Sequence, residues 1–197
     1  MIVLDIEASG TDPYKHSIVS IGALDFTNPK KQFYAECKIW NGAHVMDEAL
    51  EVNGFTREQI IDPKKKTEGE VTREFFEWLK GSPDHTTAGQ NPSFDRDFLR
   101  LAAERESIEY PLAYRTVDVH SVCYLHMIER GITPPVKNNR SDLNSGKILN
   151  YIGIPEEPKP HNALMGAKVA AEALSRLLYG KKLLPEFMEF DIKPLKS

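Results

Sequence analysis

The sequence predicts an α/β domain in which a mixed five-stranded sheet is flanked by helices. An apolar run at residues 2–6, which ends in acids, suits a buried central strand. Two longer runs, 16–26 and 31–40, joined by a turn at 27–30, are typical of a hairpin. Beyond residue 85, helical patterns alternate with two short strand-like runs, as in α/β domains. The order of these elements leaves the order of the strands in the sheet open.

Helices follow the hairpin, and capping signals mark where they begin. Thr56 with Gln59, and Thr67 with Glu70, both fit the capping box, in which each side chain bonds the other residue's main chain. The second box leads into a helix with one apolar face, formed by Val71, Phe75, Phe76 and Leu79.

The second half of the chain alternates strand and helix. Residues 85–90 fit a short strand, and Asn91 and Pro92 fit the N-cap and first position of a helix through residues 94–106. The remaining expected elements are a strand at 114–119, a helix near 120–130, a loop at 131–141, helices near 142–151 and 162–179, and an extended tail from Gly180 to Ser197.

The bulk composition bounds the class of protein. A chain of 197 residues suggests one compact domain, which we place at residues 1–180, followed by a C-terminal tail at 181–197. The residues are 41% hydrophobic and 27% charged, which is ordinary for a globular protein. The formal net charge of −4 argues against a protein that binds nucleic acid through bulk positive charge.

Neither cysteine usage nor hydropathy suggests a structural metal or a membrane. Cys37 and Cys123 lie outside any CxxC pair or Cys/His cluster, so we expect two buried, reduced thiols. The N-terminus carries no basic segment followed by a long apolar one, and no apolar run is long enough to span a bilayer. The expected location is the cytoplasm, without membrane contact.

Two acids at the end of the first strand are the first candidate site residues. Asp5 and Glu7 are two positions apart on a strand, so their side chains point to the same face. Two carboxylates there repel each other unless a cation lies between them or one is protonated. Ligands of α/β sheets also gather at the carboxyl ends of the strands. The competing interpretation, a pair of solvated acids, has about even weight on spacing alone.

The helix after Pro92 offers further candidates. Asp95 lies four residues after Asn91, so the amide and the acid share a face, while Phe94 and Phe98 are expected to anchor the helix in the core. The simpler alternative is that an acid in the first turn only complements the helix dipole.

His161 precedes the last helix. Pro160 holds the preceding chain extended, which lets His161 stand at a helix entrance facing a cleft. Taken alone, a histidine there is more often an exposed or capping residue.

These segments together resemble a known family. Residues 5–11 (DIEASGT) resemble the first motif of the DnaQ-like, DEDDh 3′→5′ exonucleases, which include RNase T-like enzymes and proofreading subunits. Residues 91–95 (NPSFD) resemble the second motif, 116–118 (TVD) the strand after it, and 160–167 (PHNALMGA) the third. The matches follow the family's order over nearly the whole chain. The resemblance implies an RNase H-like fold.

One position departs from the family's pattern. The third motif has aspartate five residues after the histidine, and this chain has Gly166 there. Glycine inside an alanine-rich helix also costs about 1 kcal/mol relative to alanine. No carboxylate shares its helix face, which carries Asn162, Ala163, Val169 and Ala170. One metal ligand is therefore missing, and the sequence leaves open whether the glycine is natural or introduced.

The resemblance implies a mechanism based on two Mg²⁺ or Mn²⁺ ions. Asp5 would bridge both ions, Glu7 would hold the ion that carries the attacking water, and Asp95 would support the other. His161 would act as the general base. The products would be 5′-mononucleotides from a DNA or RNA 3′ end, with single strands preferred. The expected substrate contacts are Ala8, Ser9, Gly10, Thr11, Asn91 and Phe94.

Gly166 keeps a second interpretation open. Loss of an anionic ligand predicts weak occupancy of the water-bearing ion and low activity, and Gly166→Asp should raise the rate about tenfold or more. The alternative is a module that binds a nucleic-acid 3′ end or a polymerase-type partner without cutting. A second copy of this chain, in a homodimer, is a further expected partner.

Overall fold

A five-stranded mixed sheet organises the chain, and the expected α/β fold is confirmed. The computed structural model describes residues 1–157 and 159–192. The strand order is β3-β2-β1-β4-β5, with β1 antiparallel to β2 and parallel to β4. The strands are β1 (Ile2–Ala8), β2 (Ile18–Asp25), β3 (Asn28–Glu36), β4 (Thr87–Gly89) and β5 (Thr116–Asp118). β1 is thus the central strand, as the apolar run predicted.

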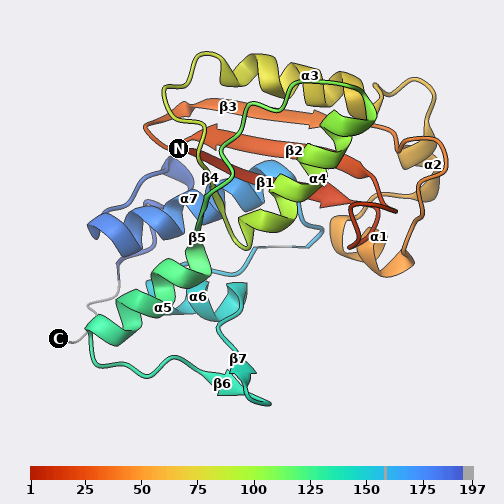
Figure 1. Ribbon diagram of the computed structural model, residues 1–197. Helices are drawn as coiled ribbons and strands as arrows, with labels where there is room; N and C mark the ends of the chain where they lie inside the picture. The colour runs from red at the N-terminus through yellow and green to blue at the C-terminus, as the bar shows by residue number, and fades with distance from the viewer. Residues whose placement is uncertain (158, 193–197) are drawn as a thin grey trace.

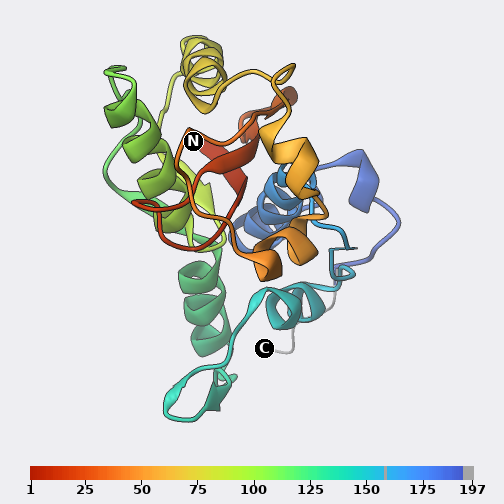
Figure 2. The ribbon, with the colours of Figure 1, turned by 90° about the vertical axis from the view of Figure 1, so that its right-hand side faces the viewer.

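Helices cover both faces of the sheet (Figure 1). The helices are α1 (Asp47–Asn53), α2 (Arg57–Ile61), α3 (Glu68–Leu79), α4 (Pro92–Arg105), α5 (Val119–Glu129), α6 (Ser145–Ile152) and α7 (Ala163–Tyr179). Helices α3 and α4 lie on one face and α7 lies on the other, while α5 and α6 extend away from the sheet (Figure 2). Both predicted capping boxes, at Thr56 and Thr67, are formed. No helix within the described ranges is long and apolar enough to cross a membrane.

The residues of β1 divide between the two faces. Ile2, Leu4 and Ile6 pack in the cluster under α3 and α4, whereas Val3 packs with α7. Because side chains alternate along a strand, Asp5 lies on the same face as Val3, toward α7. The two cysteines, Cys37 and Cys123, are buried and form no disulfide, as predicted.

Two short segments differ from the expected elements. The turn predicted at 27–30 is shorter, because β3 already begins at Asn28 and includes Pro29. Proline is tolerated there because β3 is an edge strand, where its missing N–H breaks no ladder. The loop predicted at 131–141 contains a small hairpin of β6 (Val136–Lys137) and β7 (Arg140–Ser141). Its two turn asparagines adopt positive φ, a conformation that asparagine accepts readily.

Through residue 192 the chain after α7 is not extended as expected, because a buried ion pair fixes it, and positions 193–197 of the predicted tail lie outside the described residues. Arg176 Nε donates to Glu172 Oε1 at 2.7 Å, and both side chains are at most 1% exposed. The second oxygen of Glu172 accepts the N–H groups of Leu183 and Leu184. Arg176 also donates to the carbonyls of Ile152, Phe187, Phe190 and Asp191. These bonds hold a 3₁₀ turn, Pro185–Phe187, against α7.

The start of α7 lies unusually close to the sheet. Asp5 on β1 pairs in register with Gly22 on β2. A Cβ at Gly22 would overlap the main chain of Ala163 and Leu164 in the first turn of α7. Glycine at this position therefore permits the helix to approach, and it places Gly166 directly over Asp5.

Candidate active site

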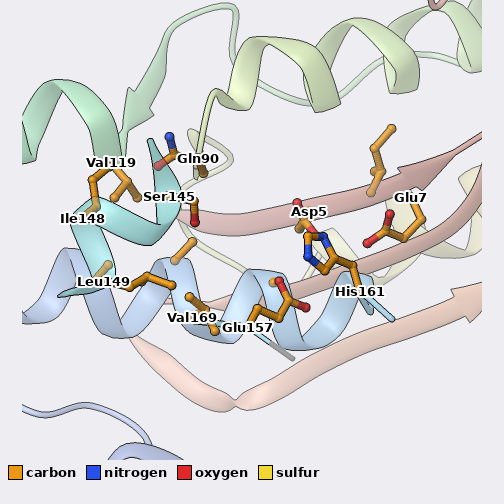
Figure 3. A pocket seen from close by; sticks show the side chains of 14 residues that line it. Asp5, Glu7, Gln90, Val119, Ser145, Ile148, Leu149, Glu157, His161 and Val169 are labelled. Carbon is orange, nitrogen blue, oxygen red and sulfur yellow. The ribbon is translucent and has the colours of Figure 1, made fainter. Parts of the chain in front are cut away.

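A cavity of about 280 Å³ opens between the carboxyl end of β1 and α7, and it collects the predicted catalytic and metal-site positions except Asp95. Asp5, Glu7, His161 and Gly166 line it. The opposite wall is mostly apolar and also carries the polar residues Gln90 and Ser145; its apolar residues are Val119, Ile148, Leu149, Val169, Ala170 and Ala173. Figure 3 shows the carboxyl groups of Asp5 and Glu7 near the His161 ring. The cavity thus combines an acidic end with an apolar one.

Asp95 reaches the same region from the other side of β1. Its Oδ1 accepts the main-chain N–H of Ile6 at 2.9 Å, and the residue is 3% exposed. The parallel pairing of β1 with β4 covers only Ile2 and Val3, so the N–H of Ile6 lies beyond the end of that ladder. Asp95 satisfies this buried donor, which would otherwise be costly. Strand β1 and helix α4 therefore bring Asp5, Glu7 and Asp95 together, as the sequence predicted.

Glu157 is a fourth carboxylate, which the sequence analysis missed. It lies in the loop between α6 and α7 and lines the cavity beside His161 (Figure 3). Its Oε1 accepts the N–H of Asn162 at 3.2 Å. The only signal in the sequence was its place four residues before the candidate histidine.

His161 stands at the entrance of α7, as expected. Its N–H donates to the carbonyl of Val52 at 2.9 Å, which fixes the main chain there. The next residue, Asn162, is the N-cap, and its side chain accepts the N–H groups of Leu164 and Met165. The capping role that competed for His161 thus belongs to Asn162, and the imidazole lines the cavity.

Burial raises the pKa values of all four acids, and neighbouring carboxylates add to this effect at Asp5 and Glu7. Burial and then the charges of Asp95, Glu7 and Glu157 raise the pKa of Asp5 well above its usual range. Burial, followed by Glu157 and Asp95, raises the pKa of Glu7 to about 8. Burial raises the pKa of Asp95 to about 7, although the hydrogen bond from Ile6 opposes this change. Burial also raises the pKa of Glu157, against the N–H of Asn162 and the charge of His161.

The loop of the first motif, residues 8–11, is held in place by hydrogen bonds and packing. Ser9 is fully buried, and its hydroxyl donates to the carbonyl of His44 and accepts the N–H of Ser17. A Cβ at Gly10 would overlap the ring of His16, so glycine is required there for packing. Thr11 is exposed, and the carbonyl of Ala8 accepts the side-chain amide of Asn53. Substrate contact by these four residues stays a prediction.

Asn91 and Phe94 are also held by their neighbours. Asn91 occupies the N-cap position of α4 with φ 54°, but its side chain caps no main-chain N–H. It is exposed and accepts a hydrogen bond from Ser93. Phe94 is half-buried, and its ring packs against the core 4.8 Å from that of Phe98, centroid to centroid. Core packing therefore accounts for Phe94, and its contact with a base stays a prediction.

The donor set suits a hard divalent cation. Carboxylate oxygens are the ligands that Mg²⁺ and Mn²⁺ prefer, and four carboxylates that repel one another are a site where a cation relieves the repulsion. Among residues 1–157 and 159–192, no three His, Cys, Asp or Glu side chains are arranged around one point as ligands of a single ion. The donor chemistry therefore fits the ions that the family resemblance implies, and the side chains must turn inward to coordinate them.

The raised pKa of Glu7 predicts how stability depends on pH. Its pKa rises on folding from the usual 4.5 to about 8, so between these values the folded chain holds more protons than the unfolded one. The free energy of unfolding should therefore fall as pH increases through this window. Mn²⁺ binds the ionised carboxylates, so its stabilising effect should grow with pH.

Thermal unfolding between about pH 5 and about pH 9, in chelator or in Mn²⁺, measures both effects. Glu7→Gln should flatten the decline in chelator, whereas Glu156→Gln, at an exposed neighbour of Glu157, should leave it unchanged. An equal decline in all three proteins would show that Glu7 does not titrate in this way.

Comparison with known protein families gives one match over most of the chain. A family described as the Rv2179c-like 3′-5′ exoribonuclease domain matches residues 1–178. The chain is 28% identical over 182 residues to the 3′-5′ DNA exonuclease Cap18 of Escherichia coli, which covers 90% of each chain. It is 31% identical over 100 residues to the PolC-type DNA polymerase III of Thermotoga maritima, which covers 51% of this chain and 7% of that protein.

Solved structures share the fold. The nuclease domain of 3′hExo, a DEDDh family member bound to rAMP, matches with a TM-score of 0.69 at 18% identity over 93% of each chain. Escherichia coli exonuclease I in complex with a 5cy-dA13 oligonucleotide matches with a TM-score of 0.70 at 16% identity, over 91% of this chain and 40% of that one. These matches confirm the RNase H-like architecture that the motifs predicted.

Proposed function

Since the chain belongs to the Rv2179c-like 3′-5′ exoribonuclease domain family, we propose that it is a divalent-metal-dependent exonuclease that releases 5′-mononucleotides from nucleic-acid 3′ ends. The observation that carries the proposal is the shared pocket of Asp5, Glu7 and His161, with Asp95 at its edge. A structural domain would have no need for mutually repelling buried acids beside a histidine.

Each residue has a distinct part in this proposal. Mg²⁺ or Mn²⁺, when bound, would polarise the scissile phosphate and neutralise charge that develops on it. Asp5 and Glu7 would hold the cations from β1, and Asp95 would support them from α4. His161 takes the proton of the attacking water, a role for which an imidazole nitrogen is suited.

The two ends of the cavity suit the two parts of a terminal nucleotide. The phosphate belongs at the acidic end, where the cations are held, and the nucleoside belongs against the apolar wall of α6 and α7. A cavity of about 280 Å³ admits one small ligand rather than a duplex end, which favours a single-stranded 3′ terminus. Relatives described as an exoribonuclease and as a DNA exonuclease support both RNA and DNA as candidate substrates.

A binding module without cleavage is the second candidate function, and Gly166 is the observation that favours it. The family's aspartate is absent from the third motif, which removes one cation ligand. Such a module would hold a 3′ end or a polymerase-type partner. A cytoplasmic location and a homodimer remain predictions under either function.

End-labelled oligonucleotides of DNA and RNA, single- and double-stranded, distinguish the two candidates. With Mg²⁺ or Mn²⁺ we expect stepwise release of mononucleotides from single strands, and none with chelator. His161→Asn should lower the rate about a hundredfold, within the range for loss of a general base, while leaving oligonucleotide binding intact. Binding without any release, under all metals, would establish the module instead.

A further inference from the structure

We propose that Glu157 supplies the carboxylate that the third motif lacks at Gly166, and so completes the cation site from the loop before α7. The inference rests on the proposed function. It adds a ligand that lies outside the three motifs, on a different element from the aspartate that it replaces.

The space at position 166 shows where the missing ligand would lie. A Cβ at Gly166 would overlap the carboxylate of Asp5, so Asp5 and Gly166 are in direct contact across the gap between β1 and α7. An aspartate at 166 would thus require the Asp5 carboxylate to turn aside, and it would then present its own carboxylate beside Asp5 in the cavity that both residues line. The missing ligand is therefore one that would belong next to Asp5, and any substitute must reach the same place.

Glu157 is the carboxylate in the cavity that can serve as this substitute. It lines the same cavity as Asp5 and Gly166, and Figure 3 shows its carboxyl group beside the His161 ring, on the side of α7. The loop is fixed before it by Ile154, whose N–H donates to Leu149, and after it by His161, whose N–H donates to Val52. Glu157 thus reaches the cavity without any rearrangement of the main chain.

The hydrogen bonding of Glu157 leaves one oxygen available. Oε1 accepts the N–H of Asn162, the N-cap of α7, which holds the side chain in place. No hydrogen bond within the described residues engages Oε2. A carboxylate with one oxygen held by a main-chain N–H, in a cavity that it shares with Asp5 and Glu7, is arranged as an oriented cation ligand.

Its neighbour Glu156 provides a matched control. Glu156 is exposed and lines a separate surface hollow with Asn150, Gly153, Ile154 and Pro155. Glu156→Gln and Glu157→Gln make the same chemical change one residue apart, but only Glu157 lines the acidic cavity. Any difference between them reports the cavity rather than net charge.

Mn²⁺ binding, measured by calorimetry and by electron paramagnetic resonance on the full chain, tests the inference. Glu157→Gln should weaken Mn²⁺ binding about tenfold to a hundredfold and reduce the metal-dependent rise in Tm, while Glu156→Gln stays within about twofold of the unmodified protein. Circular dichroism without metal verifies that each variant is folded. Equal Mn²⁺ affinity of the two variants overturns the inference.

Gly166→Asp supplies the second arm. Added to Glu157→Gln, it should restore most of the lost affinity, because it returns a carboxylate to the same place beside Asp5. Added to the unmodified chain, Gly166→Asp should raise the Mn²⁺ affinity much less. The tenfold gain in rate predicted from the sequence is therefore expected in the Glu157→Gln variant. Equal gains in both backgrounds would show that Glu157 does not substitute for it.

The outcomes separate this inference from the proposed function. If the unmodified chain binds Mn²⁺ and releases mononucleotides but Glu157→Gln behaves like Glu156→Gln, only the inference fails. If the unmodified chain neither binds Mn²⁺ nor cleaves, both fail.

Discussion

Asp5→Asn should lower mononucleotide release about a hundredfold or more, while making the metal-free protein more stable. Mutations of residues that only orient metal ligands already cost about 10–100-fold, and Asp5 is proposed as a ligand itself. It is also the acid that all three neighbours, Asp95, Glu7 and Glu157, act upon. At a pH above about 8, where these carboxylates ionise, removal of its charge should relieve that repulsion, so Tm in chelator should rise and the additional rise with Mn²⁺ should disappear.

Asp97→Asn is the matched control for this change. Asp97 lies two residues after Asp95 on α4, but its carboxylate pairs with Arg96 at the surface. Its loss should change the rate and the Mn²⁺-dependent Tm little, since exposed ion pairs contribute about 0–1 kcal/mol. Retention of activity and of metal stabilisation in Asp5→Asn would remove Asp5 from the centre of the site.

Arg176→Met should cause the largest loss of stability, about 3–5 kcal/mol, which corresponds to roughly 10 °C in Tm. The substitution leaves Glu172 charged and fully buried without its partner. It also removes the donor to main-chain carbonyls of Ile152, Phe187 and Phe190. Methionine keeps most of the volume, so the loss reports hydrogen bonding and charge rather than a cavity.

Lys168→Met provides the comparison for Arg176. Lys168 also joins α7 to the chain after it, through Glu186 at 2.6 Å, but this pair is partly exposed. Its loss should therefore cost about 0–1 kcal/mol. Urea unfolding of both variants measures the difference, and a similar small loss in each would mean that the buried pair does not hold the C-terminal segment.

Local patterns predicted the parts of the site that lie on regular elements. Strand alternation was enough to put Asp5 and Glu7 on one face, because period two is a property of the strand itself. The helix beginning at Pro92 brought Asp95 to the same strand as expected. The sequence could not show that Asp95 bonds the N–H of Ile6, since that bond depends on where β4 ends.

The parts that sequence could not predict depend on tertiary contacts. Glu157 lies in a loop without periodicity, and the chain after it is held by the bond from His161 to Val52, a contact between residues far apart in the sequence. Glu172 and Arg176 have the spacing of a solvated surface pair, and only the folded chain after α7 covers them. The small residues of the first-motif loop suggested room for a nucleotide, whereas Gly10 makes room for His16.

The hydrogen bond between Asp95 and the N–H of Ile6 fixes one carboxylate of the site, whereas the side chains of Glu7 and Glu157 can adjust. Asp95 cannot swing toward an incoming ion without leaving a sheet amide unpaired, so its carboxylate stays where β1 puts it. Glu7 and Glu157 have longer side chains, whose additional torsion lets each carboxylate travel toward that fixed reference. The two glutamates would then adjust their positions to the different ionic radii of Mg²⁺ and Mn²⁺. The length of these side chains would therefore allow the site to bind either metal.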